Sequence, residues 1–459
     1  MQLSSEAHLG DSTGPVLPCG PIVANFLRLA NITRVTVALI SAVDPYPTDA
    51  GKKVVLAGFI DYLTERHGQD NVHYIKVGVA PQQQFPVRVH VVPGPSRREV
   101  LGNLMTRVST GRASLQEAFL GSPQTAAGIA DILERISPDL QIYDTVRMAQ
   151  YAPDQIAAEQ VCYLDDLFSE RYDRMLQAAE KFGDINVSPL GNFAEHVPAK
   201  LRPLATHRRS QTMLLRAERS LVRRSEDRTA RRFRRSLLVN ADEANVLMER
   251  TDLGADRIQS IPPLITVPAG PERDYNGAPE FAFLGLLSLP HNDDGLRSFL
   301  ETAWPLILKR HPDARLRIIG REARPELLAL AATLGDSVVM EGYVPDLGAA
   351  LSGVAALVNP LRFGSGIKLK VIEALGRALP VVSTPIGAEG FASGPGTGVL
   401  IGRQPAELAE LLCSLTDRGI NAEISAQARE HFRTTYSRSA VFAAYDTAFS
   451  VCRGQLHLC

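Results

Sequence analysis

A glycine-rich segment, Gly364-Ser365-Gly366, lies between a predicted strand and a predicted helix in the last third of the chain. We expect this helix to start near Gly366 and to run to about Arg377, so that its first N–H groups and its dipole face an anion at the loop. Lys368 and Lys370 add two positive charges, and Glu373 follows. Glycines, cations and then a carboxylate suit a nucleotide diphosphate: the cations would bind the phosphates, and Glu373 the ribose hydroxyls.

The two lysines are two positions apart, so they cannot share one face of a regular helix. We assign Lys368, which is nearer the helix start, to the phosphates, and Lys370 to an ion pair with Glu373 at i,i+3. Arg362, just before the glycines, is a second phosphate candidate. The alternative for Glu373 is a plain surface residue that pairs with Lys370 and binds no ligand.

A second loop, Gly387-Ala388-Glu389-Gly390, follows a predicted buried strand at 379–383. Glu389 accepts a hydroxyl near the donor sugar in one interpretation. In the other, it is an acid favoured by the dipole at the start of a helix.

Together these segments resemble the donor-binding region of family 4 glycosyltransferases, which have the two-domain GT-B fold. The resemblance rests on Glu373-Ala374, Pro380-Val381-Val382 and the loop at 387–390. Many members have two glutamates separated by seven residues, and here the first position is Ser365, as in the Gly-x-Lys-x-Lys branch. The resemblance implies a nucleotide-diphosphate sugar as co-substrate, no cofactor, no metal and a retaining outcome. It supplies no protein nucleophile, so no catalytic base is assigned.

Two further segments extend the resemblance through residues 280–450. Gly342-Tyr343-Val344-Pro345-Asp346 resembles the loop that receives the nucleotide base, which places Tyr343 in the donor site. The family also has an arginine and a lysine early in this domain, but residues 286–295 contain neither. Lys368, Arg362 and the helix N-terminus must then balance the charge of the departing diphosphate.

The whole chain of 459 residues alternates predicted strands and helices, which predicts an α/β fold with two tandem Rossmann-like domains of GT-B type and a cleft between them. We expect a flexible tail at 1–33, an acceptor domain at 34–265, a donor domain at 280–437 and a last helix, 438–450, that crosses back. The formal net charge is −1, which predicts no general affinity for nucleic acid. Scattered cysteines and the lack of an apolar run of membrane-spanning length favour a cytoplasmic protein.

Three residues in the N-terminal half are candidates for the cleft. Gly51 and Lys52 follow the first strand and open a helix, and ligands of open α/β sheets bind at the carboxyl ends of strands. Asp166 follows another strand. The alternatives are an ordinary turn with solvated lysines for the first two, and a helix cap for Asp166.

Arginine crowds the segment 199–236, which we read as a basic helical insertion. An amphipathic basic helix can lie on an anionic membrane, which would suit a lipid-linked acceptor and peripheral attachment. A solvated helix packed by its leucines is the alternative, and the scarcity of aromatic residues disfavours nucleic acid.

The sequence therefore predicts a glycosyltransferase that moves a sugar from a nucleotide-diphosphate sugar to a glycan or lipid-linked acceptor, in polysaccharide or glycan assembly. One alternative is a degenerate member that binds a nucleotide sugar or a partner without turnover. A sugar-nucleotide epimerase on the same fold is the other.

Overall fold

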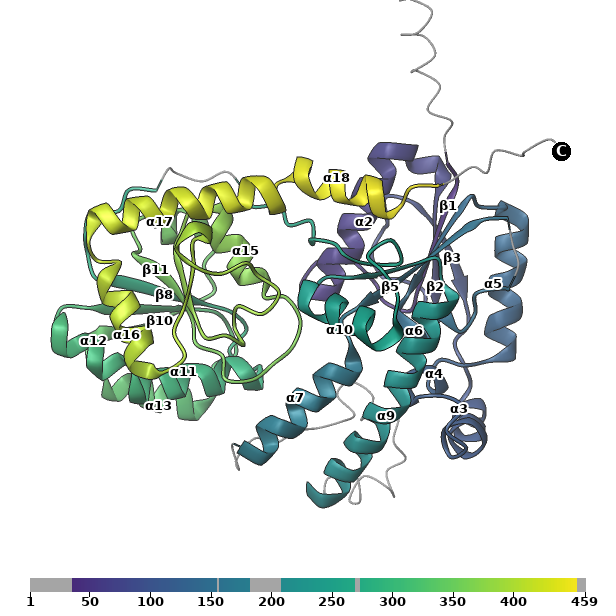
Figure 1. The fold of residues 1–459 in the computed structure, drawn as a ribbon, viewed down its shortest axis with the longest axis horizontal. Helices are drawn as coiled ribbons and strands as arrows, with labels where there is room; N and C mark the ends of the chain where they lie inside the picture. Colours follow the sequence, from purple (N-terminus) through teal and green to yellow (C-terminus); the bar gives the residue numbers. More distant parts are fainter. Residues whose placement is uncertain (1–34, 155–156, 182–207, 269–272, 452–459) are drawn as a thin grey trace, which may run out of the picture.

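The computed structural model describes residues 35–154, 157–181, 208–268 and 273–451. The predicted tail at 1–33 and the first part of the basic segment, 199–207, lie outside the described residues. Two α/β domains stand side by side (Figure 1).

The N-terminal domain is built on a sheet of seven parallel strands in the order β3-β2-β1-β4-β5-β6-β7. The strands are β1 (Val37–Ser41), β2 (Val72–Val77), β3 (Arg88–Val92), β4 (Leu140–Asp144), β5 (Glu159–Asp165), β6 (Arg235–Leu238) and β7 (Ile258–Ser260). Every residue of β1 and β4 is buried, as expected for apolar strands that helices cover on both faces.

Helices connect these strands. They are α2 (Gly51–His67), α3 (Arg97–Asn103), α4 (Leu115–Ala118), α5 (Pro123–Ile136), α6 (Thr145–Ala149), α7 (Phe168–Lys181), α9 (Arg208–Arg232) and α10 (Ala241–Thr251). A π-helical turn, η2 (Leu104–Val108), continues α3. In Figure 1, α7 and α9 project together from the lower side of the domain.

The C-terminal domain has six parallel strands in the order β10-β9-β8-β11-β12-β13. They are β8 (Glu280–Leu284), β9 (Arg315–Ile319), β10 (Val338–Gly342), β11 (Ala356–Asn359), β12 (Val381–Ser383) and β13 (Val399–Ile401). Its helices are α11 (Pro290–Thr302), α12 (Trp304–Arg310), α13 (Pro325–Thr333), α14 (Leu347–Leu351), α15 (Leu369–Gly376), α16 (Pro405–Ser414) and α17 (Arg418–His431). The predicted pair of Rossmann-like sheets is therefore confirmed.

Strand order places the functional loops. It reverses between β1 and β4 in the first sheet and between β8 and β11 in the second, and ligands of open α/β sheets bind at the carboxyl ends of strands beside such reversals. Gly51, Asp166, and the glycine-rich segment at 364–366 all follow carboxyl ends. The topology alone therefore brings the predicted residues of each domain to one edge of its sheet.

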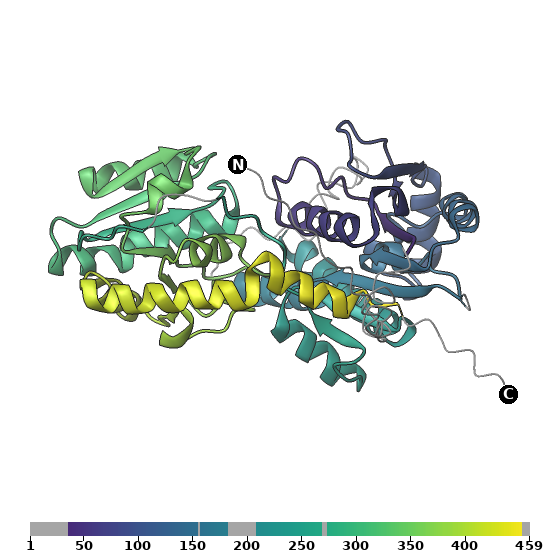
Figure 2. The ribbon, with the colours of Figure 1, turned by 90° about the horizontal axis from the view of Figure 1, so that it is seen from above.

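The last helix, α18 (Arg438–Ala448), continues from the C-terminal domain across to α2 (Figure 2). Phe442 and Tyr445 are buried against Tyr62, with ring centroids 5.1 and 5.3 Å away at nearly right angles. The Tyr62 hydroxyl also donates a hydrogen bond of 2.9 Å to Asp446. Edge-to-face rings add to the area they bury, so α18 belongs to the core of the N-terminal domain.

We predict that Phe442→Ala lowers the free energy of unfolding of the N-terminal domain by about 3 kcal/mol, because a buried ring is replaced by a cavity. Urea denaturation followed by circular dichroism measures this change, while the fluorescence of Trp304, the only tryptophan, follows the C-terminal domain. Arg433→Ala is the control, since its exposed ion pair with Glu430 is worth under about 1 kcal/mol. An unchanged dichroism transition in Phe442→Ala would contradict this packing.

Candidate functional site

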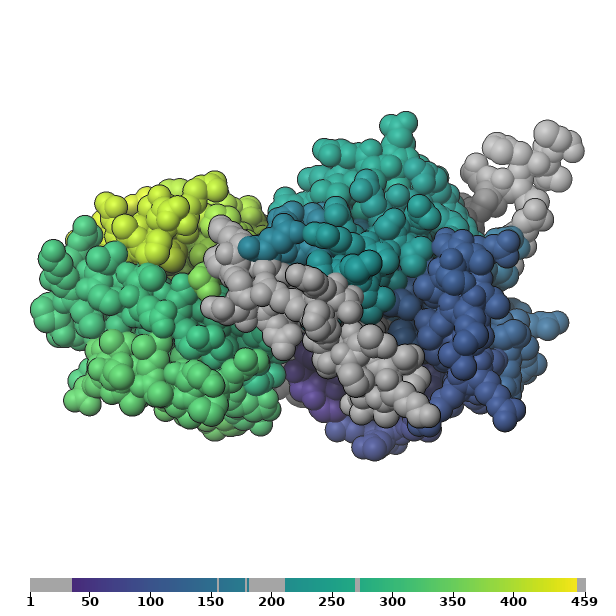
Figure 3. Space-filling view, turned by 90° about the horizontal axis from the view of Figure 1, so that it is seen from below, coloured from purple at the N-terminus to yellow at the C-terminus, as the bar shows by residue number. Residues whose placement is uncertain are grey.

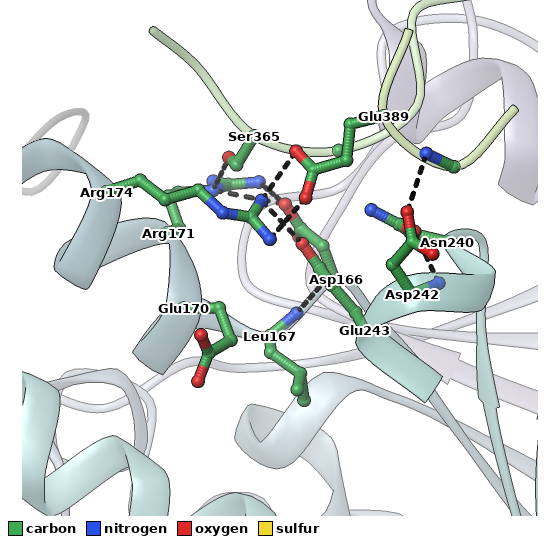
Figure 4. A network of polar contacts seen from close by, with 12 residues as sticks. Asp166, Leu167, Glu170, Arg171, Arg174, Asn240, Asp242, Glu243, Ser365 and Glu389 are labelled. Carbon is green, nitrogen blue, oxygen red and sulfur yellow. Dashed lines mark hydrogen bonds and ion pairs between the residues drawn. The ribbon is translucent and has the colours of Figure 1, made fainter. Parts of the chain in front are cut away.

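Two arginines of α7 connect the domains at the carboxyl ends of the sheets (Figure 4). Arg171 Nε donates a hydrogen bond of 2.8 Å to Ser365 Oγ in the glycine-rich segment of the other domain. Arg174 Nη1 donates to Glu389 Oε2 at 2.8 Å and to Glu243 Oε1, on α10 of its own domain, at 3.1 Å. The predicted residue Glu389 thus reaches the N-terminal domain through Arg174.

Glu243 connects Arg174 to the backbone just before α7. Its carboxylate accepts a hydrogen bond of 2.6 Å from the Leu167 N–H, just before α7 begins, and the side chain is fully buried. Burial, and next the charge of Asp166, raise the pKa of Glu243 to about 8. The Leu167 N–H and Arg174 favour the carboxylate but only partly offset this rise. Arg174 is therefore the cation that allows Glu243 and Glu389 to lie near one another.

The consecutive acids Asp165 and Asp166 point to different partners. Burial raises the pKa of Asp165, although Lys52 opposes this, whereas the pKa of Asp166 is lowered because the Arg171 guanidinium outweighs burial. Asp166 Oδ2 accepts from Arg171, and its buried Oδ1 has no hydrogen-bond partner among the described residues. An unsatisfied buried acceptor at a domain junction is suited to a hydroxyl group of a ligand.

Backbone strain accompanies these acids. Asp165 and Thr145 both have positive φ, 73° and 64°, directly at or after the ends of β5 and β4. Left-handed backbone is costly for residues with a side chain, above all for a β-branched one, and it concentrates at functional sites.

The glycine-rich segment differs from its prediction in one respect. The helix, α15, begins at Leu369 and not near Gly366, because Gly364 and Gly366 have φ of 132° and 71°, which lie outside the helical region. The segment packs against Asp166: a Cβ at Gly366 would lie 3.3 Å from its Oδ2. Gly364 and Gly366 thus let the loop approach the N-terminal domain closely.

Lys368 stands at the N-cap position of α15, and its ammonium donates to the carbonyl oxygens of Ser365 and Gly366 at 3.0 and 2.5 Å. It is only 8% exposed. Burial lowers its pKa to about 8, although Glu389 and Asp166 favour the charged form.

Lys370 does not pair with Glu373, so that prediction was wrong. Its ammonium donates to Asn292 Oδ1 at 2.9 Å and lies 4.0 Å from the centroid of the Phe283 ring. Glu373 instead accepts from Arg377 Nε at 2.8 Å, one turn later on the same helix. Burial, and next the charge of Lys368, hold the pKa of Lys370 well below its usual value, and no acid of the described residues forms an ion pair with it.

His291 completes this group from the start of α11. A Cβ at Gly364 would lie 3.8 Å from its ring. Burial, followed by the charges of Lys370, Lys368 and Arg171, lowers the pKa of His291 to about 3, so its imidazole is neutral. Several cations thus converge on one buried region, and such a region attracts an anionic ligand.

The remaining predicted residues have other partners. Arg362 forms a two-pronged ion pair with Asp294, with Nε to Oδ2 at 2.8 Å, and this pair neutralises its charge. Tyr343 is 67% exposed on the loop after β10, and Arg321 lies 5.2 Å from its ring centroid.

Gly51 begins α2 and faces α15, since a Cβ there would lie 3.8 Å from Leu369. Lys52 is bound by Asp144 at 2.5 Å and Asp165 at 3.3 Å. Burial alone would lower its pKa, but these carboxylates outweigh burial and raise it. Lys52 is therefore neutralised within its own domain.

The sequence interpretation missed Arg171, Arg174 and His291 and misassigned Lys370. No local sequence pattern indicates these contacts, because the partners are far apart in the chain. Arg171 and Ser365 are 194 residues apart, and Lys370 and Asn292 are 78 apart. Within the described ranges, no group of three His, Cys, Asp or Glu residues is arranged to hold a metal ion.

Residues 278–418 match the sequence family described as Glycosyl transferases group 1. The matched residues include β8, the glycine-rich segment and α15. This part of the chain is therefore similar to group 1 glycosyl transferases.

A curated relative matches part of the chain. It is an uncharacterized 44.6 kDa protein in the cps region of Klebsiella pneumoniae, 28% identical over 170 residues, which are 35% of this chain and 44% of that protein. The chain thus spans less than half the length of the relative it matches.

Solved structures share the fold over most of the chain. TarM of S. aureus superposes with a TM-score of 0.57 at 10% identity, covering 91% of this chain and 99% of that one. HepE of Anabaena, in complex with UDP and glucose, gives 0.55 at 13%, covering 90% and 99%. Sucrose-phosphate synthase of Thermosynechococcus elongatus gives 0.55 at 14%, covering 89% and 96%. These likenesses establish a GT-B fold, and the residues that match the family model lie in its second half.

We predict that Arg174→Met separates the domains, because Glu243 and Glu389 lose their shared cation, at a cost of about 2 kcal/mol to the contact. Small-angle X-ray scattering should show a larger radius of gyration. Arg219→Met is the matched control, since Arg219 pairs with Asp173 at 2.9 Å within the N-terminal domain. An unchanged radius in Arg174→Met would show that this bridge does not hold the domains together.

Proposed function

We propose that this protein transfers a sugar from a nucleotide-diphosphate sugar, bound mainly by the C-terminal domain, to an acceptor that approaches from the N-terminal domain. The observation that carries the proposal is the gathering of Lys368, Lys370 and Arg171 around the start of α15, within the residues that match group 1 glycosyl transferases or against them. No acid balances Lys370 among the described residues, so a diphosphate would offset the cost of burying it.

The diphosphate would lie between the start of α15 and the loop after β8. Lys370 is the main cation in this assignment, since Lys368 is bound to backbone carbonyls and Arg362 is neutralised by Asp294. Neutral His291 can donate a hydrogen bond to a phosphate oxygen without adding charge. The N–H groups at the start of α15 add the helix dipole. These groups stabilise the charge that develops on the leaving diphosphate, and the proposal assigns no metal.

Arg171 adds a condition to this chemistry. It belongs to the N-terminal domain but contacts Ser365 of the other, so it joins the cation group only when the domains are together. Closure would then complete the site and exclude water at the same time. Because Arg171 is paired with Asp166, it would add a hydrogen-bond donor from across the junction and little net charge.

The other donor contacts follow from unsatisfied oxygens. Both contacts from Arg377 fall on Glu373 Oε1, which leaves Oε2 for a ribose hydroxyl. Tyr343, exposed beside the β10 loop, is assigned to the base. Asp166 Oδ1, which is buried without a partner, and Glu389 are assigned to sugar hydroxyls.

The acceptor and its setting rest on the comparisons. We propose a glycan or lipid-linked acceptor in polysaccharide assembly, supported by the cps-region relative, and a retaining outcome. UDP sugars are the first donors to test, because HepE of Anabaena was solved with UDP and glucose.

A catalytically degenerate nucleotide-sugar binder is the second candidate. Ser365 stands where many family members have the first of two glutamates, and its hydroxyl is occupied by Arg171. Such a protein would bind the donor but neither transfer nor slowly hydrolyse it. Conversion of the sugar nucleotide without an acceptor would instead indicate an epimerase.

We predict that Lys370→Met abolishes most donor binding. A nucleoside diphosphate at roughly 100 times its dissociation constant should stabilise the native protein by about 2.7 kcal/mol, and removal of the buried ammonium should weaken affinity at least tenfold. Thermal unfolding with UDP and other nucleoside diphosphates measures both. Without ligand, the variant should be no less stable, because an unpaired buried charge is removed. Lys309→Met, an exposed lysine of α12, is the control. Equal ligand shifts in all three proteins would exclude the assigned phosphate site.

We predict that donor affinity falls as the pH rises above about 8. Lys368 has its pKa lowered to about 8, so it is charged below this pH and neutral above it, and an anion binds the charged form. Titration calorimetry from pH 7 to 9.5 avoids the second phosphate ionisation near pH 6. Lys368→Met should flatten the profile. A wild-type affinity that stays constant across this range would refute the role of Lys368.

A further inference from the structure

We propose that the N-terminal domain docks on an anionic lipid bilayer through α3 and η2, residues 96–112, which we call the docking helix. This surface is distinct from the donor site and places an apolar patch and unpaired positive charge on one exposed element.

The docking helix exposes two large apolar side chains to solvent. Leu101 is 48% exposed and Met105 66%, and their i,i+4 spacing puts them on one face. No residue of α3 or η2 is buried, so this helix contributes little to the core. A helix that is fixed in place yet presents its apolar side outward is typical of an interfacial element.

Arginines surround that apolar face. Arg97, Arg98 and Arg112 are exposed and form no ion pair within the described ranges, and Arg107 contacts the neutral Gln150. The one acid of the docking helix, Glu99, is bound to Ser96 and Ser122 and caps α3. Four arginines against one glutamate leave a net charge of +3. Arginine beside exposed leucine and methionine matches anionic headgroups above acyl chains.

The neighbouring helix α9 extends the charge and adds one exposed apolar side chain, Met213, which is 72% exposed. A Cβ at Gly111 would lie 3.5 Å from Arg224 of α9, so the two elements adjoin on the lower face (Figure 3). However, the apolar residues Leu215 and Val222 of α9 are buried in the protein. Several of its arginines are already neutralised: Arg216 by Glu180, Arg219 by Asp173, Arg228 by Glu117 and Arg232 by Asp154.

We thus place the membrane contact on the docking helix, whereas the sequence indicated the segment 199–236. Insertion into a bilayer would come mainly from Leu101 and Met105, and α9 would supply flanking charge and the single side chain of Met213. No helix of the described residues meets the length and apolarity needed to cross a membrane, so attachment at the surface is the mode that fits this patch.

The position of the docking helix connects it to the site. It follows β3, and since all strands of the sheet are parallel, it lies on the same edge as Asp166 after β5. If the acceptor is lipid-linked, which rests on the proposed function, docking would bring headgroups to the side of the sheet from which the acceptor enters.

Vesicle flotation tests the proposal without any sugar nucleotide, so its outcome does not depend on transferase activity. The full chain is mixed with vesicles of phosphatidylcholine alone or with one third phosphatidylglycerol. We expect at least tenfold tighter binding to the anionic vesicles, weakened by salt. Leu101→Asp with Met105→Asp should weaken it at least tenfold, and Arg97→Glu with Arg98→Glu by a similar factor.

Leu328→Asp is the matched control, because Leu328 is 45% exposed in the C-terminal domain and should leave flotation unchanged. Circular dichroism confirms that each variant is folded. The proposal would be overturned if the Leu101/Met105 variant floated as the wild type does. Binding of that variant to soluble heparin would then indicate that the face recognises a polyanion. Loss of binding only in Arg223→Ser with Arg224→Ser would assign it to α9.

Discussion

Buried positive charge at the start of α15 is the constraint around which the junction is organised. Two lysines that are two residues apart lie in a region poor in water, and one of them is compensated only by an amide oxygen and an aromatic face. Such charge costs stability unless an anion enters. The nearby acids relieve it only in part: Glu389 and Asp166 favour charged Lys368, but burial outweighs them, and these acids and Glu243 already bind Arg171 and Arg174.

The junction contains two kinds of charge cluster. Balanced clusters, such as Lys52 between Asp144 and Asp165, fix the shape of loops and remain satisfied without a ligand. The unbalanced cluster beside His291 has no such internal solution. The distinction explains why Lys52, which the sequence placed in the cleft, is held by two carboxylates of its own domain, whereas Lys370, which the sequence placed in a helical ion pair, lies where we propose that the diphosphate binds.

The fold could be predicted from sequence because central parallel strands covered on both faces, such as β1, β4 and β11, are short buried runs rich in apolar residues. The glycine-rich segment could also be located, since its backbone requires glycine. The start of α15 could not, because the left-handed glycines displace it by three residues. Partners of Lys370 and Arg171 could not either, since they come from distant strands and helices whose packing no local pattern encodes.

The crossing of α18 also has a consequence for how the chain is made. Phe59 and Tyr62 of α2 are translated before the C-terminal sheet, but the rings that cover them are translated after it. The core of the N-terminal domain therefore stays incomplete, with an aromatic patch exposed, until the C-terminal sheet has been translated. A fragment that ends after β7 would keep that patch exposed permanently, so the two domains are separate in architecture but not in folding.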